Sequence, residues 1–85
     1  MGNNRLRVVI KGKFLNLIYK GKLTSVYLFY DESRGTFPVG VSNSLDLQIG
    51  KSCSATAEIY GRTTKRADQD VSYSLRMDVV NILES

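Results

Sequence analysis

Apolar and polar residues alternate with a period of two along most of this chain, and this pattern restricts the possible folds more than any other feature. Residues 5–11 place leucine, valine and isoleucine on one face and two arginines and a lysine on the other. A similar alternation returns over residues 23–30, 52–60 and 71–79. A period of two is typical of half-buried strands, whereas amphipathic helices repeat every 3.6 residues. The sequence therefore predicts an all-β fold.

Two hairpins are predicted. The first has the turn Tyr-Lys-Gly-Lys at residues 19–22, where Gly21 is expected to take a positive φ. The second joins strands over residues 55–60 and 71–77 through the loop 61–70, which carries three basic residues. Both hairpins combine aromatic residues along the strands with positive charge at the ends, as a binder of single-stranded nucleic acid requires.

Glycine and proline indicate how the strands close. Gly12 interrupts the first strand and predicts a bend that lets one long strand serve both sides of a small barrel. Pro38 predicts that the short strand over residues 36–41 lies at an edge or is bulged. Residues 45–49 are predicted to form a single helical turn closed by Gly50. This layout favours a small five-stranded OB-like barrel, with an SH3-like barrel as the alternative.

The core is predicted from the faces of the strands. Phe14 and Phe29 are expected to be buried, and the apolar face of residues 53–59 is expected to point inward. Tyr60 lies on the opposite face and is expected to be exposed. Tyr73 shares a face with other apolar residues, so its ring is expected to pack.

The last strand carries one irregularity in its pattern. Residues 71–79 place alternate apolar side chains on one face, and the adjacent Val79 and Val80 then shift the phase toward Ile82. The apolar face is therefore predicted to continue beyond this point in a different phase.

Composition limits the function further. The 85 residues suit one domain spanning 1–85 with a modest core and no deep enzyme cleft. Twelve basic and eight acidic residues give a net charge of +4, which favours an anionic partner. The single cysteine, Cys53, is expected to be a small buried hydrophobe in a reducing interior. The N-terminus lacks a signal-peptide pattern and no apolar run reaches membrane-spanning length, so we expect a cytoplasmic protein without membrane contact.

Catalytic and metal-binding chemistry is not expected. The absence of histidine removes the commonest general base and the commonest metal ligand. The string Gly50-Lys51-Ser52 resembles the end of a phosphate-binding P-loop, but Leu45 stands where that motif requires glycine. Asp68 and Asp70 are expected to neutralise neighbouring basic residues rather than hold a cation. The sequence thus predicts no enzyme, no cofactor and no metal site.

The predicted function is sequence-tolerant binding of single-stranded nucleic acid, DNA rather than RNA. Basic residues would neutralise phosphates along one side of the barrel, and aromatic residues would stack on bases. The candidate phosphate-binding residues are Arg7, Lys11, Lys13, Lys20, Lys22, Arg62, Lys65 and Arg66. The candidate aromatic contacts are Tyr19, Tyr27, Phe37 and Tyr60.

The pair Gly21-Lys22 in a turn, followed by Phe37-Pro38-Val39-x-Val41, resembles the filamentous-phage gene V type of single-stranded DNA-binding protein. This resemblance implies a five-stranded OB-type barrel that forms two-fold homodimers, with the second hairpin reaching across to the partner subunit. It implies that Lys22 matches the lysine of the DNA-binding wing and that Phe37 faces DNA. Thr24 departs from the family, whose wing carries a tyrosine there. The chain is similarly close to compact OB-fold single-strand binders of plasmids, conjugative elements and other phages. These resemblances imply a role in replicating a phage, plasmid or mobile element.

Two other classes of function remain open. A protein-interaction barrel, acting as a subunit of a larger complex, would use the same basic loops on an acidic partner. An enzyme or small-ligand protein is disfavoured by the missing histidine. Binding to oligonucleotides, to a nucleic-acid-free partner or to a metabolite distinguishes the three.

Overall fold

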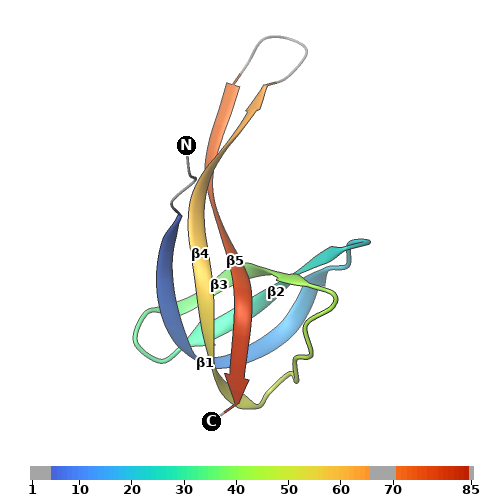
Figure 1. The fold of residues 1–85 in the computed structure, drawn as a ribbon, viewed down its shortest axis with the longest axis vertical. Coiled ribbons are helices and arrows are strands. Elements are labelled where there is room, and N and C mark those ends of the chain that lie inside the picture. Colours follow the sequence, from blue (N-terminus) through green and yellow to red (C-terminus); the bar gives the residue numbers. More distant parts are fainter. Residues whose placement is uncertain (1–4, 66–70, 85) are drawn as a thin grey trace.

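The computed structural model describes residues 5–65 and 71–84, and these form a closed five-stranded barrel in the order β1-β2-β3-β5-β4 (Figure 1). The strands are β1 (Leu6–Tyr19), β2 (Thr24–Asp31), β3 (Gly35–Ser42), β4 (Ser52–Lys65) and β5 (Val71–Glu84). β1 pairs with both β2 and β4, and β3 meets β5 in parallel. This is the Greek-key order of an OB-like barrel, so the predicted all-β class and barrel are confirmed and the SH3-like alternative is not adopted.

The bend predicted at Gly12 is the joint of the barrel. The first part of β1 pairs with β4 up to Lys13, and the part from Gly12 onward pairs with β2. A Cβ atom at position 12 would overlap the carbonyl oxygen of Tyr30, so only glycine allows β2 to approach this closely. One long strand therefore serves both sides of the barrel, as predicted.

The core lies inside the barrel and is built around two phenylalanines. Phe14 and Phe29 are fully buried and meet edge to face, with ring centroids 4.9 Å apart. The inward face of β4 supplies Cys53, Ala55 and Ala57, all buried. The core positions predicted from alternation are confirmed there, because the small side chains of β4 leave room for the two rings.

Two predicted local conformations are wrong. Gly21 is not among the glycines with positive φ, which in the described chain are Gly35 and Gly50. Glycine is nonetheless required at position 21, because a Cβ atom would overlap the carbonyl oxygen of Thr24. Residues 45–49 form no helical turn; Ile49 instead bridges to the neighbouring β1 strand, and leucines at alternate positions pack against the core. A period of two within a short segment suits this extended path better than a helix.

β3 has a largely open edge, as its proline predicts. It pairs with β2 over its whole length but with β5 only at Gly40 and Val41. Pro38 therefore lies where no second neighbouring strand needs its missing N–H group. Apart from Gly40 and Val41, this edge of β3 is not paired with β5.

The second hairpin is longer than predicted and projects beyond the barrel (Figure 1). β4 and β5 remain paired as far as Lys65 and Val71, and the predicted tip residues Arg66, Asp68 and Asp70 lie outside the described residues. Tyr73 is 79% exposed, so the prediction that its ring packs is wrong for the chain alone. The ribbon carries the ring past the end of the barrel, where the core no longer covers that face.

The phase shift predicted near the end of β5 is present. Ala57 is the partner of Val79, and the preceding residue Thr56 is the partner of Asn81. Val80 is therefore the extra residue of a β-bulge, and beyond it Ile82 points toward the core.

Candidate functional site

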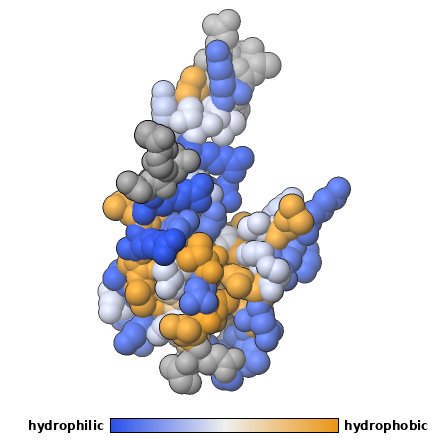
Figure 2. All heavy atoms as spheres, in the orientation of Figure 1, coloured by the Kyte–Doolittle hydropathy of each residue, from blue (hydrophilic) through white to orange (hydrophobic). Residues whose placement is uncertain are grey.

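The two hairpins diverge from the same end of the barrel and leave a hollow between them (Figures 1 and 2). An open groove of about 220 Å³ lies at its base, and we call this groove the cleft. It is lined by Val26, Pro38, Val39, Gly40, Leu75, Arg76 and Met77. One wall therefore comes from β2 and β3 and the other from β5, across the open edge of β3.

The first hairpin is held rigidly by a buried serine and an asparagine. The Nδ2 atom of Asn43 donates to the carbonyl oxygens of Gly21 and Lys22, at 2.9 and 3.0 Å. The Oγ atom of Ser25, which is fully buried, donates to Oδ1 of Asn43 at 2.6 Å. These bonds satisfy the backbone of the loop without using the side chains of its lysines. The hairpin is thus a fixed support for whatever its side chains bind.

Lys20 and Lys22 are exposed at this support, and neither forms an ion pair with another described residue. Tyr19 is 63% exposed beside them, on the outward side of β1. An exposed ring next to two unpaired ammonium groups can stack on a base while the ammonium groups contact phosphates. The predicted contacts Tyr19, Lys20 and Lys22 therefore lie together in the first hairpin, and Tyr19 is the register partner of Val26, which lines the cleft.

Tyr27 and Phe37 point the other way. Both are half-buried and pack against the core, the first with its ring centroid 6.1 Å from Phe14 and the second 6.1 Å from Phe29. Alternation in β2 and β3 places them on the same face as the fully buried residues. These two predicted aromatic contacts therefore face the core rather than the exposed surface that carries Tyr19.

Tyr60 and Arg7 already have partners within the chain. The hydroxyl of Tyr60 donates to Oδ2 of Asp78 at 2.6 Å, and the Arg5 guanidinium lies 3.9 Å from the centroid of its ring. The hydrogen bond to Asp78, together with burial, raises the pKa of Tyr60. Arg5 and Arg7 both pair with Glu58, at 3.6 and 3.0 Å. Both arginines therefore share the single carboxylate of Glu58.

Gly40 and Asp78 are register partners at the point where β3 meets β5, next to the cleft. The Oδ1 atom of Asp78 is buried and accepts no hydrogen bond from the described residues. A Cβ atom on Gly40 would lie 2.5 Å from it. A side chain at position 40 would therefore require the Asp78 carboxylate to move.

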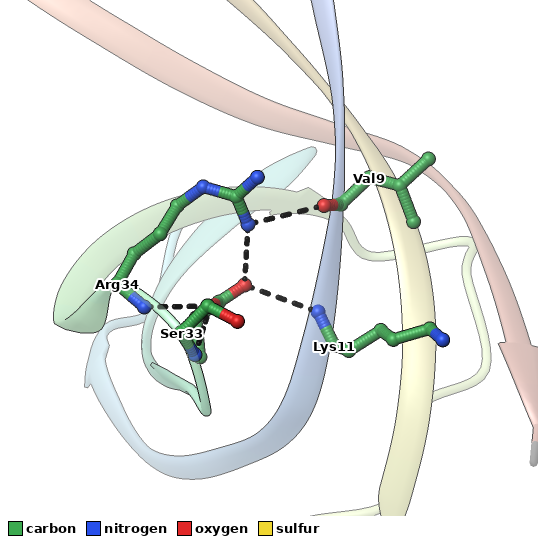
Figure 3. Close-up of polar contacts among 5 residues, drawn as sticks. Val9, Lys11, Ser33 and Arg34 are labelled. Carbon is green, nitrogen blue, oxygen red and sulfur yellow. Dashed lines mark hydrogen bonds and ion pairs between the residues drawn. The ribbon is translucent and has the colours of Figure 1, made fainter.

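The opposite end of β2 is anchored by Asp31, which is 1% exposed (Figure 3). Its carboxylate accepts hydrogen bonds from the backbone N–H groups of Lys11, Ser33 and Arg34, at 3.1, 2.8 and 2.9 Å. It also pairs with Nη1 of Arg34 at 3.0 Å, and the same nitrogen donates to the carbonyl oxygen of Val9. Burial alone would raise the pKa of Asp31, but these hydrogen bonds and the guanidinium outweigh burial and lower it. The turn between β2 and β3 is thereby fixed to β1.

The remaining predicted cations are spread over the molecule. Lys11 and Lys13 are exposed on the outward side of β1, whereas Arg62 and Lys65 are exposed on the second hairpin. Because Arg62 and Lys65 are three positions apart on one strand, they point to opposite faces of the ribbon. Arg66 lies outside the described residues. The cations therefore do not all lie along one side of the barrel.

Three exposed or cleft-lining residues were not predicted from the sequence as candidate binding residues: Tyr30, Tyr73 and Arg76. Tyr30 is 40% exposed on the outward side of β2, and Arg76 lines the cleft. The alternation in β2 carries a signal for Tyr30, because it directly follows Phe29, which was expected to be buried, and so lies on the opposite face. Nothing local distinguishes Arg76, whose position depends on where β5 leaves the barrel.

No family model matches this chain, and no curated protein matches it either. Among solved structures, the chain is similar to the mitochondrial single-stranded DNA-binding protein of S. cerevisiae. The TM-score is 0.64 with 13% sequence identity, and the match covers 93% of this chain and 91% of that one. The two share a fold.

No helix among the described residues is long and apolar enough to cross a membrane. The same residues contain no group of three or more histidine, cysteine, aspartate or glutamate side chains placed to hold a metal ion.

Proposed function

We propose that this protein binds single-stranded nucleic acid, DNA rather than RNA, with little dependence on base sequence. The observation that carries the proposal is the cleft between two divergent hairpins, together with exposed Tyr19 and the unpaired Lys20 and Lys22 on the first hairpin. The similarity in fold to a single-stranded DNA-binding protein supports it. A role in replicating a phage, plasmid or other mobile element is part of the proposal.

In the proposed mechanism, both hairpins contact the nucleic acid. The bound single-stranded nucleic acid lies across the outward face of β2 and β3. Its phosphates contact Lys20 and Lys22 at one end and Arg76 and Arg62 at the other. Bases stack on Tyr19 and lie against the apolar floor of the cleft. Each stacked base contributes about 1–3 kcal/mol, independently of its identity, because every base has a π-face. The sequence tolerance follows from this chemistry.

Binding should depend strongly on salt. If four or five cations contact phosphates at once, log K plotted against log salt should have a slope of about −3, since each neutralised phosphate on a single strand releases about 0.7 counterion. A fluorescence titration with a labelled thymidine 12-mer at several salt concentrations measures the slope. A 12-bp duplex is the control, and we expect it to bind more weakly because its bases are not available for stacking. Affinity that does not change with salt would contradict the mechanism, and failure to bind any oligonucleotide at low salt would favour the protein-interaction barrel.

We also propose that the chain forms a homodimer through the second hairpin. Val71, Tyr73 and Leu75 lie on one face of this ribbon and are 41%, 79% and 78% exposed. The same face of β5 continues into the core at Val79. A two-stranded ribbon is marginally stable by itself, so covering this face with the same face of a second copy stabilises both.

Sedimentation at micromolar concentration tests the dimer. The parent protein should sediment as a dimer, and Leu75→Ser should shift it toward monomer because the serine removes apolar area from the proposed interface. Leu83→Ser is the matched control, since Leu83 is 58% exposed on the same strand but lies outside the ribbon. A parent that stays monomeric at all concentrations would rule out the dimer and leave the barrel and its cleft unaffected.

A further inference from the structure

A row of neighbouring side chains crosses the outward face of the barrel at the end of β2 that is remote from the first hairpin. Lys13 on β1 is the register partner of Tyr30 on β2, and Tyr30 is in turn the partner of Thr36 on β3. Side chains of directly opposed residues in antiparallel strands lie on the same face, with Cβ atoms about 4.5–5.5 Å apart. An ammonium group, a phenol ring and a hydroxyl group are therefore adjacent there.

The groups of this row are available to a ligand. Tyr30 is 40% exposed, and Lys13 and Thr36 are exposed. Lys13 forms no ion pair with another described residue, in contrast to Arg7 on the same face of β1, which is neutralised by Glu58. The row thus repeats the chemistry found at Tyr19, with one exposed ring beside an unpaired ammonium group.

Between Tyr19 and Tyr30, the outward face of β2 and β3 carries apolar side chains. Leu28 and Pro38 are register partners on the outward face, and Leu28 is half-buried. Val26, the partner of Tyr19, lies at the other end of the same face. A continuous surface therefore runs along β2 from Tyr19 to Tyr30 without a described acidic side chain among these positions.

We propose that Lys13 and Tyr30 form a second nucleotide-binding subsite, with Tyr30 stacking on a base and Lys13 contacting the adjacent phosphate. This proposal rests on the proposed function and adds that the bound strand runs along β2 away from the cleft. The subsite is held in position by Asp31, the residue after Tyr30, whose carboxylate ties the end of β2 to the backbone of β1. The ring is therefore presented from a fixed strand rather than from a loop.

The distance between the rings of Tyr19 and Tyr30 determines how long an oligonucleotide must be to contact both. Tyr30 lies four positions beyond Val26, which corresponds to about 13 Å at 3.3–3.4 Å per residue. Stacked bases of one strand are about 3.4 Å apart, so the rings cannot serve adjacent stacked bases. An oligonucleotide that keeps its bases at the stacked spacing must therefore extend about four nucleotides beyond the first ring before it gains the second contact, which is more than a trimer spans.

Titration of labelled thymidine oligonucleotides of three, six and twelve residues tests the subsite. Tyr30→Ala should weaken binding of the 12-mer roughly five- to 150-fold, the loss expected for one stacked base, and should leave the trimer nearly unchanged. Tyr30→Phe should restore the 12-mer affinity, because phenylalanine keeps the ring. Lys13→Gln should reduce the salt slope for the 12-mer by about 0.7, whereas Arg7→Gln should not, since Arg7 is paired and lies outside the proposed surface.

The outcomes separate this subsite from the function on which it rests. If the parent binds no single strand, both fail. The parent protein could bind the 12-mer with an affinity that depends on Lys20 and Lys22, while Tyr30→Ala binds it as tightly as the parent does. In that case only the subsite is overturned. An equal loss at all three lengths, or a loss that phenylalanine does not restore, also overturns it, because Tyr30 would then act through the fold. Melting curves for each variant identify that case.

Discussion

Asp31→Ala should destabilise the protein by about 2–4 kcal/mol, the largest stability change that we expect from any single polar residue. The carboxylate is buried and accepts hydrogen bonds from three backbone N–H groups and a guanidinium, and alanine leaves all of these donors without their acceptor. Urea denaturation measures the change. Glu32→Ala is the matched control, since this exposed carboxylate is next in sequence and should change the free energy of unfolding by less than about 0.5 kcal/mol. Equal effects of the two substitutions would contradict the role assigned to Asp31.

The same carboxylate gives stability a defined pH dependence. Because the folded state lowers the pKa of Asp31 below its ordinary value of 3.8, its contribution is fully present above that value. The contribution is lost as the pH falls through the lower pKa of the folded state. Asp31→Asn cannot titrate at this position, so the stability difference between parent and variant should shrink below about pH 4. A difference that stays constant from pH 6 to pH 3 would show that the charge of Asp31 does not matter.

The barrel itself could be predicted because its decisive features are local. The bend at Gly12, the small inward face of β4 and the break in phase at Val79-Val80 are all visible in the sequence, and each limits how the strands pair. The conformation at Gly21 could not be predicted in the same way. It depends on the carbonyl oxygen of Thr24 and on Asn43, which is distant in sequence, so a turn rule based on neighbours gave the wrong φ.

The candidate site was less predictable than the fold because a formal charge does not show whether a partner neutralises it. Arg7 and Lys13 look alike in the sequence, but Glu58 on β4 pairs with one and not with the other. Tyr60 lies on the outward face as predicted, but it is half-buried rather than exposed: Arg5 lies over its ring and Asp78 accepts its hydrogen bond. Pairings across strands decide which exposed groups can bind, and these depend on the register of the closed barrel.

Replacing Lys20 and Lys22 together by alanine should weaken binding of a single strand roughly 60-fold at 50 mM salt and about tenfold at 200 mM. Each lost phosphate contact removes about 0.7 from the magnitude of the salt slope, so the pair removes about 1.4, and the loss shrinks as salt rises. Stability should change by less than about 1 kcal/mol, because the hairpin is held through its backbone by Asn43 rather than by the lysine side chains. Titration with the labelled 12-mer and a melting curve measure the two quantities.

The matched control removes the same charge from two arginines that already pair with a carboxylate. Arg5→Gln combined with Arg7→Gln also lowers the net charge by two, but both arginines pair with Glu58 and stand outside the proposed binding surface. If net charge alone attracted the nucleic acid, the two double variants would lose affinity and slope equally. If the first hairpin contacts phosphates directly, only the lysine variant shows the drop of about 1.4 in slope. A lysine variant that binds as tightly as the parent with the same slope would leave the two lysines as solubilising residues at a hairpin tip, and the strand would have to bind elsewhere on the barrel.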